Sequence, residues 1–378
     1  FMKQIYLDYN ATTPVDKRVL NKMLPYFNDR FGNASSRQHS FGWDAQEAVE
    51  EARMEIAELI NAHASEIIFT SSATESINLV LKGIIGSDNY RGNHIVTSCV
   101  EHNAVLQTCR YLEKKGISVT YLPVNRDGTV NPRLIKKNIT DKTMLIAIMA
   151  ANNETGSINN IAKISFIAQN SNIPFFTDAT QAVGKIPFDV KTCYLDFAAF
   201  SSHKLYGPKG IGALYINKNT EGTLIPLIHG GGQEQGKRGG TLNVPAIVGF
   251  GEACSMLREN LNQEITQISQ LRDTFELQIL DTFHSARING RGSLRLPNTS
   301  NIAFQGCTIK DVIRKIGFIA VSTDSACTTA KSEPSHVLKA MGLNEEQISG
   351  SVRFSLGRYT TDQEVQDVIK AFKNAILP

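Results

Sequence analysis

The 378-residue sequence has few cysteines, no long hydrophobic run and almost no excess of charge. Its six cysteines are scattered and none forms a Cys-x-x-Cys pair, so neither a disulfide framework nor a metal site is expected. Apolar runs such as 144–151 are far shorter than the roughly 20 residues that span a bilayer. A net charge of +3 gives no electrostatic reason to expect nucleic acid or a membrane as a direct partner. No secretory signal is visible. The scattered cysteines fit a reducing, cytoplasmic compartment best.

The composition is that of an ordinary globular protein, since 42% of the residues are hydrophobic and 20% are charged. A chain of this length exceeds one minimal domain, so we expect one large domain and a smaller one. We predict a large domain at residues 13–255 and a small α+β domain at residues 1–12 and 256–378.

Short apolar strands alternate with helices up to about Val244. The spacing of apolar residues along 44–61 places them on one face of a helix. Further helices are predicted at 74–86, 103–115 and 161–170, and strands at 66–70, 94–97, 118–122, 143–149, 174–178, 197–201 and 211–216. Apolar strands separated by helices predict an α/β fold with a mostly parallel sheet covered on both faces. In such sheets the ligand lies at the carboxyl ends of the strands.

The alternation of short apolar strands with helices ends after about Val244. Two long helices are predicted at 245–260 and 263–283. The rest is mixed, with strands predicted at 301–304, 318–321 and 351–355 and helices at 309–316 and 362–375. We interpret this part as the smaller α+β domain. The N-terminal strand, 5–7, could join either unit.

Lys204 ends the segment Ser201-Ser202-His203-Lys204, which follows a predicted buried strand and precedes a glycine-rich turn at 206–210. A lysine at the carboxyl end of a strand lies where the sheet binds ligands. Burial there lowers the pKa of an amine and makes it nucleophilic, as Schiff-base chemistry requires. Taken alone, a lysine is more often a solvated surface residue.

Asp178 ends the strand that precedes the one leading to Lys204. A carboxylate on that neighbouring strand can pair with a pyridinium nitrogen and so make the ring an electron sink. Without Lys204, a role as a cap for the following helical segment would be equally plausible.

The segment 71–75 contains Ser72 and Glu75 at the spacing of a capping box, which predicts the start of a helix. Free backbone N–H groups and the helix dipole favour a phosphate at such a start, and Thr74 adds a hydroxyl donor. Most capping boxes bind no ligand. This one indicates a phosphate site because it follows a strand of the predicted α/β sheet.

His102 follows the predicted strand 94–97 and opens the next helix. A histidine at this place can stack on a planar ring and shuttle protons. A helix-capping or core histidine is the plainer interpretation of the residue taken alone.

In this order the motifs resemble the class-V, fold-type I pyridoxal-phosphate (PLP) enzymes, and among them the cysteine desulfurases of the NifS/IscS type. The resemblance spans essentially the whole chain. Its matching segments are 7–14, 31–33, 72–76, 101–102, 152–156, 178–181, 202–210, 238–241, 325–327 and 352–358. None of these motifs would suffice alone, but jointly they are highly specific.

The resemblance implies a PLP enzyme that converts L-cysteine to L-alanine and leaves a persulfide on Cys327. Lys204 would carry the cofactor, Cys327 would accept the sulfur, and His102 would shuttle protons. The cofactor-binding residues implied are Ala73, Thr74, His102, Asn153, Asp178, Gln181, Ser201, His203, Lys204 and Thr241. Thr241 would act across the interface of a homodimer. The substrate carboxylate would be held by Asn33, Asn153 and Arg353, with Arg358 either a rival for Arg353 or a structural ion pair.

Cys327 lies in the small, polar segment 322–331, which has the composition of a loop. We expect the other five cysteines to be structural. Asp324 stands where the family usually has glycine. An anion near a thiol raises the thiol pKa, so the reactivity of Cys327 could differ from that of its relatives.

Three other functions remain open at this point. A class-V aminotransferase would share Lys204, Asp178 and the phosphate site but needs no loop cysteine. A selenocysteine lyase would use the same scaffold. A catalytically idle sulfur-relay or scaffold subunit is the alternative from another class. For a desulfurase, the sulfur acceptor could be an iron–sulfur scaffold, a tRNA-thiolation enzyme or a DNA sulfur-modification protein.

Overall fold

The fold centres on a seven-stranded sheet in a computed structural model that describes residues 4–85, 87, 92–220, 224–323 and 334–377. The strands follow one another across the sheet in the order β2 (Ile67–Thr70), β8 (Gly212–Ile216), β7 (Phe197–Ser201), β6 (Phe175–Asp178), β5 (Thr143–Ala147), β3 (His94–Ser98) and β4 (Ser118–Leu122). Strand β8 runs antiparallel to both of its neighbours, and the other pairs are parallel. The predicted mostly parallel sheet is therefore confirmed.

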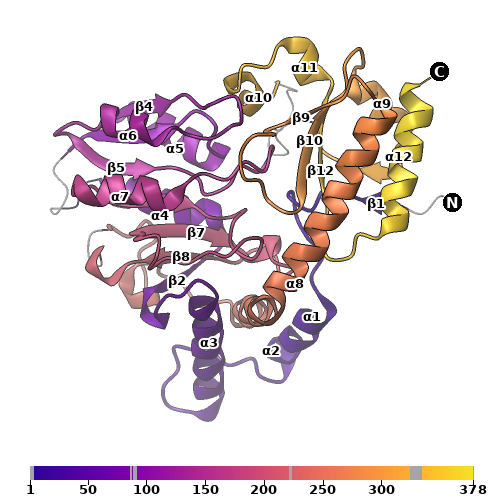
Figure 1. Ribbon diagram of the computed structural model, residues 1–378. Helices are drawn as coiled ribbons and strands as arrows, with labels where there is room; N and C mark the ends of the chain where they lie inside the picture. Colours follow the sequence, from indigo (N-terminus) through magenta and orange to yellow (C-terminus); the bar gives the residue numbers. More distant parts are fainter. Residues whose placement is uncertain (1–3, 86, 88–91, 221–223, 324–333, 378) are drawn as a thin grey trace.

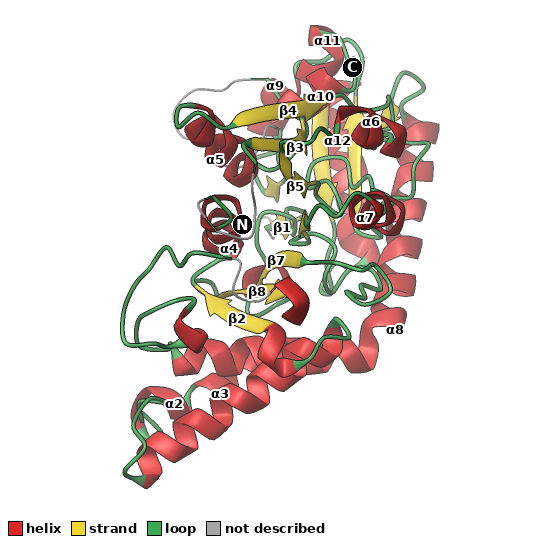
Figure 2. Ribbon diagram, turned by 90° about the vertical axis from the view of Figure 1, so that its left-hand side faces the viewer, coloured by secondary structure: helices red, strands yellow, loops and turns green. Residues whose placement is uncertain are grey.

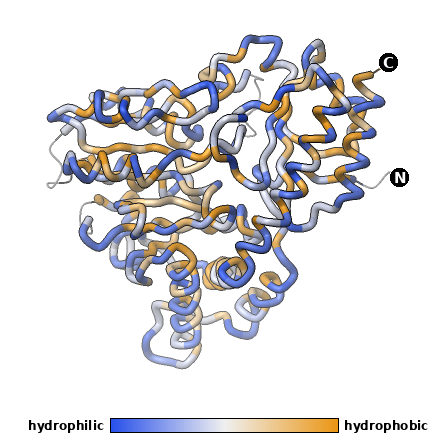
Figure 3. Tube along the Cα trace, in the orientation of Figure 1, coloured by the Kyte–Doolittle hydropathy of each residue, from blue (hydrophilic) through white to orange (hydrophobic). Residues whose placement is uncertain are grey.

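Helices cover both faces of this sheet (Figure 2). Helices α4 (Ala73–Gly83) and α5 (Asn103–Glu113) lie on one side, and α6 (Pro132–Asn138) and α7 (Ile161–Asn170) on the other. Two separate hydrophobic cores result, one on each face. Every residue of the inner strands is buried, which explains why they read as unbroken apolar runs. Figure 3 shows hydrophobic residues along the central strands and hydrophilic ones on the outer loops.

A smaller unit packs beside the sheet (Figure 1). Its antiparallel sheet has the order β12 (Ser351–Ser355), β10 (Thr299–Ala303) and β9 (Arg287–Asn289). Its helices are α9 (Ile309–Lys315), α10 (His336–Ala340), α11 (Glu345–Ser349) and α12 (Asp362–Ile376). Strand β1 (Ile5–Tyr6) pairs in parallel with β11 (Ile319–Ala320), so the N-terminal strand joins this unit.

Helix α8 is continuous over Val244–Thr282, so the prediction of two separate helices here is wrong. Its first part packs in the core of the large sheet through residues such as Phe250 and Leu257. Its last part packs in the smaller core through Phe275 and Ile279. The stretch between them is only partly buried, with Leu261 packed against the first core and Ile268 and Leu271 against the second, so no break separates the two halves. The boundary that we placed after residue 255 falls inside this helix, and the division into two domains stays a prediction.

The N-terminal region adds three helices below the sheet (Figure 1): α1 (Lys17–Met23), α2 (Pro25–Asn28) and α3 (Ser40–Leu59). Our sequence analysis missed the first two, which are short. None of the helices in the described ranges, α8 included, is both long and apolar enough to cross a membrane.

A buried ion pair fastens the glycine-rich segment 229–240 to the fold. Both oxygens of Glu234 accept hydrogen bonds from the Arg53 guanidinium at 2.8 Å, and Phe69 N donates to Glu234 Oε2 at 2.7 Å. Arg53 also stacks over the Phe69 ring. Glu50 is a second, more exposed partner of Arg53 at 3.2 Å.

We expect Glu234→Ala to lower the free energy of unfolding by about 3–5 kcal/mol, because it leaves a buried guanidinium without its partner. Glu50→Ala removes the exposed partner of the same arginine and is the matched control, expected to cost less than about 1 kcal/mol. Urea unfolding at one fixed protein concentration measures both. Equal losses for the two variants would contradict the structural role of the buried pair.

Candidate active site

A cavity of about 250 Å³ opens at the carboxyl ends of the central strands. This volume is close to the lower end of the roughly 300–1,000 Å³ typical of small-molecule sites. Its lining includes Asn10, Ser72, Ala73, Thr74, His102, Met149, Asn153, Asp178, Thr180, Gln181, Ser201, His203, Lys204, His336 and Arg353. The site expected at this edge of the sheet is therefore a real cavity.

Lys204 reaches the cavity from the short turn that follows β7. Its Nζ donates hydrogen bonds to the backbone oxygens of Asn10 at 2.7 Å and of Ala11 at 2.6 Å. Lys204 is thus a partly buried amine held at the wall of the cavity, and the interpretation as a solvated surface lysine is wrong.

Asp178 is the last residue of β6, directly beside β7, where it pairs in register with Ala199. Its side chain is only 5% exposed, and Oδ1 accepts a hydrogen bond from Thr180 N at 3.0 Å. Among the described residues no cation forms an ion pair with it. A buried carboxylate without a cation is unfavourable, so it suits a ligand that brings a protonated nitrogen. Thr180 Oγ1, buried without a hydrogen-bond partner, offers the same cavity a further polar contact.

His102 caps helix α5, as its plainer interpretation predicts, and it also lines the cavity, where its role in stacking and proton transfer stays a prediction. Its Nδ1 accepts a hydrogen bond from Ala104 N at 3.1 Å, which leaves the proton of the neutral ring on Nε2. Glu101 is fully buried behind it, where burial raises its pKa to about 8. Ser98 Oγ and Met149 N donate to Glu101 Oε1 at 2.6 and 3.1 Å. The carboxyl group is therefore mainly neutral at pH 7 and brings little charge to the wall.

The start of α4 forms the part of the cavity best suited to an anion. Ser72 Oγ caps the helix by accepting a hydrogen bond from Glu75 N at 3.3 Å. The Glu75 carboxylate accepts its hydrogen bond from Ser71 N at 2.7 Å and not from Ser72 N. The return bond of the predicted capping box is therefore made one residue before the N-cap. A side chain on Gly212 would put its Cβ 2.6 Å from the Ser72 carbonyl carbon, so only glycine lets β8 approach the start of the helix. The N–H groups of the first turn face the cavity region lined by Ala73 and Thr74.

His203 and Ser201 complete this end of the cavity. Burial, together with the charges of Lys204 and Lys209, lowers the pKa of His203 to about 4. His203 is therefore neutral at pH 7, and its Nδ1 lies 3.1 Å from Thr12 Oγ1. An anion bound here would meet backbone N–H groups, hydroxyls and a neutral imidazole.

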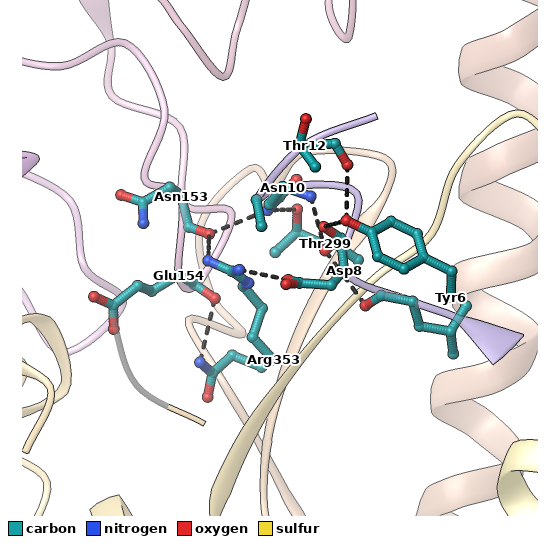
Figure 4. A network of polar contacts seen from close by, with 12 residues as sticks. Tyr6, Asp8, Asn10, Thr12, Asn153, Glu154, Thr299 and Arg353 are labelled. Carbon is teal, nitrogen blue, oxygen red and sulfur yellow. Dashed lines mark hydrogen bonds and ion pairs between the residues drawn. The ribbon is translucent and has the colours of Figure 1, made fainter. Parts of the chain in front are cut away.

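Arg353 closes the side of the cavity toward the smaller unit (Figure 4). It is 3% exposed, and Nη2 pairs with Asp8 Oδ1 at 2.6 Å while Nη1 donates to Asn153 O at 3.0 Å. Its Nε is buried and makes no hydrogen bond to any other described residue. Asn10 Nδ2 bonds the same Asn153 oxygen at 3.1 Å and Thr299 Oγ1 at 2.8 Å, tying the two units together.

Arg358, the rival of Arg353, lies outside the residues that line the cavity. It pairs with Asp16 at 2.9 Å and with Glu264 at 2.7 Å, and its guanidinium stacks over the Tyr206 ring. The structure therefore gives it the alternative role, a structural ion pair.

The structure gathers ten of the thirteen site residues named from the sequence around one cavity: Ala73, Thr74, His102, Asn153, Asp178, Gln181, Ser201, His203, Lys204 and Arg353. Asn33 and Thr241 are exposed and lie outside the cavity of their own chain. Cys327 and Asp324 lie outside the described residues. Burial raises the thiol pKa of all five other cysteines (Cys99, Cys109, Cys193, Cys254 and Cys307), which makes them poor nucleophiles.

Four residues at the site escaped our sequence analysis as individual groups: Asn10, Thr180, Lys185 and His336. Asn10 and Thr180 stand inside motifs that we matched, but no spacing rule pointed to their side chains. His336 lines the cavity from α10, with Nε2 3.1 Å from Glu101 O. No local signal connects α10 to a site more than 200 residues away in the sequence.

Comparisons with known proteins agree with this geometry. The family model of the class-V aminotransferases matches residues 5–368. A protein named cysteine desulfurase IscS from Rickettsia bellii (strain OSU 85-389) is 47% identical over 97% of this chain and 89% of its own length. A solved structure described as a NifS-like protein superimposes with a TM-score of 0.91 at 37% identity, covering 98% of both chains. Another, described as SspA in complex with cysteine, has a TM-score of 0.81 at 36% identity and covers 94% of this chain and all of its own.

Proposed function

This chain belongs to the class-V aminotransferase family, and on that premise we propose that it is a PLP-dependent cysteine desulfurase. The substrate is L-cysteine, the products are L-alanine and a persulfide on Cys327, and the sulfur then passes to an acceptor protein. One observation carries the proposal: Lys204 follows β7 and Asp178 ends the neighbouring β6, so both line one cavity, and the buried Asp178 carboxylate has no cation partner among the described residues. The relatives named cysteine desulfurase and the neighbour solved with cysteine supply the reaction and the substrate class.

The residues present fit PLP. When bound, this cofactor supplies an aldehyde that bonds to amines and a ring that accepts the electrons released at the substrate α-carbon. Asp178 would hold its protonated ring nitrogen, and Gln181 its ring hydroxyl. The start of α4, with Ala73 and Thr74, would hold its phosphate together with Ser201 and His203. His203 is neutral, and this fits its place, because the imidazole then neither gains nor loses a proton when the phosphate binds.

Lys204 has two tasks in this proposal. Its amine would hold the cofactor, and in its neutral form the same amine would take the α-proton of L-cysteine. The pair of backbone carbonyls that now hold Nζ keeps it at the cavity wall. His102, with its proton on Nε2, lies on the cavity lining where it can stack on a ring and exchange protons with the substrate thiol.

Arg353 and Asn153 would orient the substrate by its carboxylate, with Asn33 as a third group. Arg353 lines the cavity, and its planar guanidinium suits a carboxylate. The Cys327 thiolate would then attack the substrate sulfur: the new S–S bond forms, the Cβ–S bond breaks, and its electron pair returns toward the carbon skeleton that becomes alanine.

A homodimer with active sites at its interface is part of the proposal. Thr241 is exposed and does not line the cavity of its own chain, which is compatible with a group that serves a partner subunit. Exposed apolar side chains gather on the N-terminal helices and the segment between them: Leu24, Phe27, Phe31, Phe41 and Trp43. An apolar surface of this kind is typical of a protein–protein interface.

The sulfur acceptor is proposed as a protein in the cytoplasm. The name IscS of the relatives favours iron–sulfur cluster assembly over tRNA thiolation and DNA sulfur modification. We propose no direct contact with nucleic acid and no membrane association.

Borohydride reduction tests the proposal directly. Reduction of the purified holoprotein should fix the phosphopyridoxyl mass on the peptide that contains Lys204, and the peptide with Lys185 should stay unmodified. With L-cysteine and a thiol reductant, the same preparation should release alanine and sulfide in equal amounts. A chain that carries the cofactor elsewhere, or that needs a keto acid to turn over, would disprove this function.

A further inference from the structure

Arg353, the residue that we assign to the substrate carboxylate, is itself held by two protein groups (Figure 4). Its Nη2 pairs with Asp8 Oδ1 at 2.6 Å, and its Nη1 donates to the backbone oxygen of Asn153 at 3.0 Å. The Arg353 side chain is 4% exposed and that of Asp8 18%, so the ion pair is largely withdrawn from water. Asp8 lies in one of the matched motifs, but the proposed reaction gives it no task.

Backbone hydrogen bonds hold Asp8 in place beside Arg353. Asp8 forms a parallel bridge with Ser355, which lies two residues after Arg353 on β12. Tyr9 N donates to Ser355 O at 3.1 Å, and the Tyr6 hydroxyl donates to Asp8 O at 3.0 Å. The Asp8 carboxylate is therefore carried by a segment that is bonded directly to the strand of Arg353.

Asp8 lies outside the cavity that Arg353 lines. Arg353 and Asn153 belong to the cavity lining, whereas Asp8 does not. A ligand in the cavity would therefore touch the guanidinium and not the Asp8 carboxylate. Direct contact between Asp8 and a carboxylate ligand would also be unfavourable, because two anions repel each other. Any favourable effect of Asp8 on such a ligand must act through Arg353.

A guanidinium binds a carboxylate well only when its plane is correctly oriented. Its N–H groups form a rigid fork that meets the two carboxylate oxygens through parallel hydrogen bonds. An arginine side chain has many rotamers, and fixing it at the moment of binding costs affinity. The bonds to Asp8 and to the Asn153 oxygen are made by different Nη atoms, so together they orient the Arg353 guanidinium before a ligand binds.

We propose that Asp8 is a positioning residue, which holds the Arg353 guanidinium in the orientation that receives the carboxylate of an amino-acid substrate. This inference deepens the proposed function and rests on it. The orienting bond and the charge of Asp8 act in opposite directions, because a nearby anion by itself weakens the binding of another anion. An amide that keeps the acceptor without the charge should therefore preserve binding, and removal of the acceptor should weaken it.

Calorimetric titration of the purified holoprotein tests this role. L-Alanine, the proposed product, is compared with ethylamine, which lacks only its carboxylate, and the ratio of the two dissociation constants reports how much the carboxylate contributes to binding. We expect Asp8→Ala to lower this contribution by about tenfold or more, as for loss of a hydrogen bond to a charged group. Asp8→Glu keeps the charge but displaces the acceptor by one methylene group, and it should also lower the contribution. Asp8→Asn should keep it at the parent value or above.

Two results would overturn the inference: an unchanged contribution of the carboxylate in Asp8→Ala, or an equal loss in Asp8→Asn and Asp8→Ala. Thermal unfolding shows which variants are folded, and Asp8→Glu decides the first point if Asp8→Ala does not fold. Asp16→Asn is the matched control, because Asp16 pairs with Arg358 and neither residue lines the cavity. This control should keep the parent ratio.

Arg353→Ala separates the inference from the proposed function. If this variant keeps the parent ratio, the assignment of Arg353 to the substrate carboxylate fails, and the role of Asp8 fails with it. A loss in Arg353→Ala without a loss in Asp8→Ala refutes the inference alone. The titration measures binding and not turnover, so failure of the desulfurase chemistry would appear in the borohydride and sulfide assays.

Discussion

The Lys204→Ala protein is expected to lose the visible absorbance band of the bound cofactor and to release no sulfide from L-cysteine. The variant lacks both the amine that carries the cofactor and the base that removes the α-proton. Loss of a positioned general base alone lowers rates by roughly 10²–10⁴-fold, and loss of the covalent link adds to this. Absorbance spectra and a sulfide assay on the same preparations measure the two effects.

Lys218→Ala is the matched control for this experiment. Lys218 is an exposed lysine beyond the end of β8, outside the cavity lining, so its variant should keep the band and the activity. Sulfide release at the parent rate by the Lys204→Ala protein would refute the assignment of the amine.

The Cys327→Ser protein is expected to keep the cofactor band and to bind L-cysteine, but to lose persulfide formation and sulfide release down to the background of the assay. A serine hydroxyl has a far higher pKa than a thiol and cannot form the S–S bond that accepts the sulfur. Spectral change on adding cysteine reports binding, and mass spectrometry of the protein reports the added sulfur atom.

Cys307→Ser is the control, because Cys307 is a partly buried cysteine whose pKa burial raises. It should leave sulfur transfer intact. Asp324→Gly restores the residue usual in the family, and removal of the anion should lower the pH needed for transfer from Cys327. An active Cys327→Ser protein would remove the persulfide from the mechanism.

The strands could be predicted from the sequence because the sheet is buried on both faces. The expected limits of 118–122, 161–170 and 197–201 agree with β4, α7 and β7 to the residue. The same method failed for helix α8, because the two halves of this helix bury their apolar residues in different cores. A periodicity argument assumes one buried face and cannot describe a helix that serves two.

The site residues likewise include some whose place the sequence predicts and others whose place it does not. Lys204, Asp178 and His102 each end or begin a regular element, and the fold rule for parallel sheets brings such positions to one edge. Asn10 bonds Lys185 and, through the Asn153 oxygen, is joined to Arg353 by hydrogen bonds that span more than 140 positions of the sequence. No local pattern encodes contacts of that range.

The sequence by itself determined the α/β architecture, the family motifs and the lysine, aspartate and cysteine on which the proposed chemistry depends, because strand and helix periodicity and short motifs are local properties. Only the tertiary structure decided that Asp178 has no cation partner among the described residues, that Arg358 is structural and that Lys185 and Lys204 share Asn10. Those facts depend on which distant groups share a cavity, and burial and charge act through space, not along the chain.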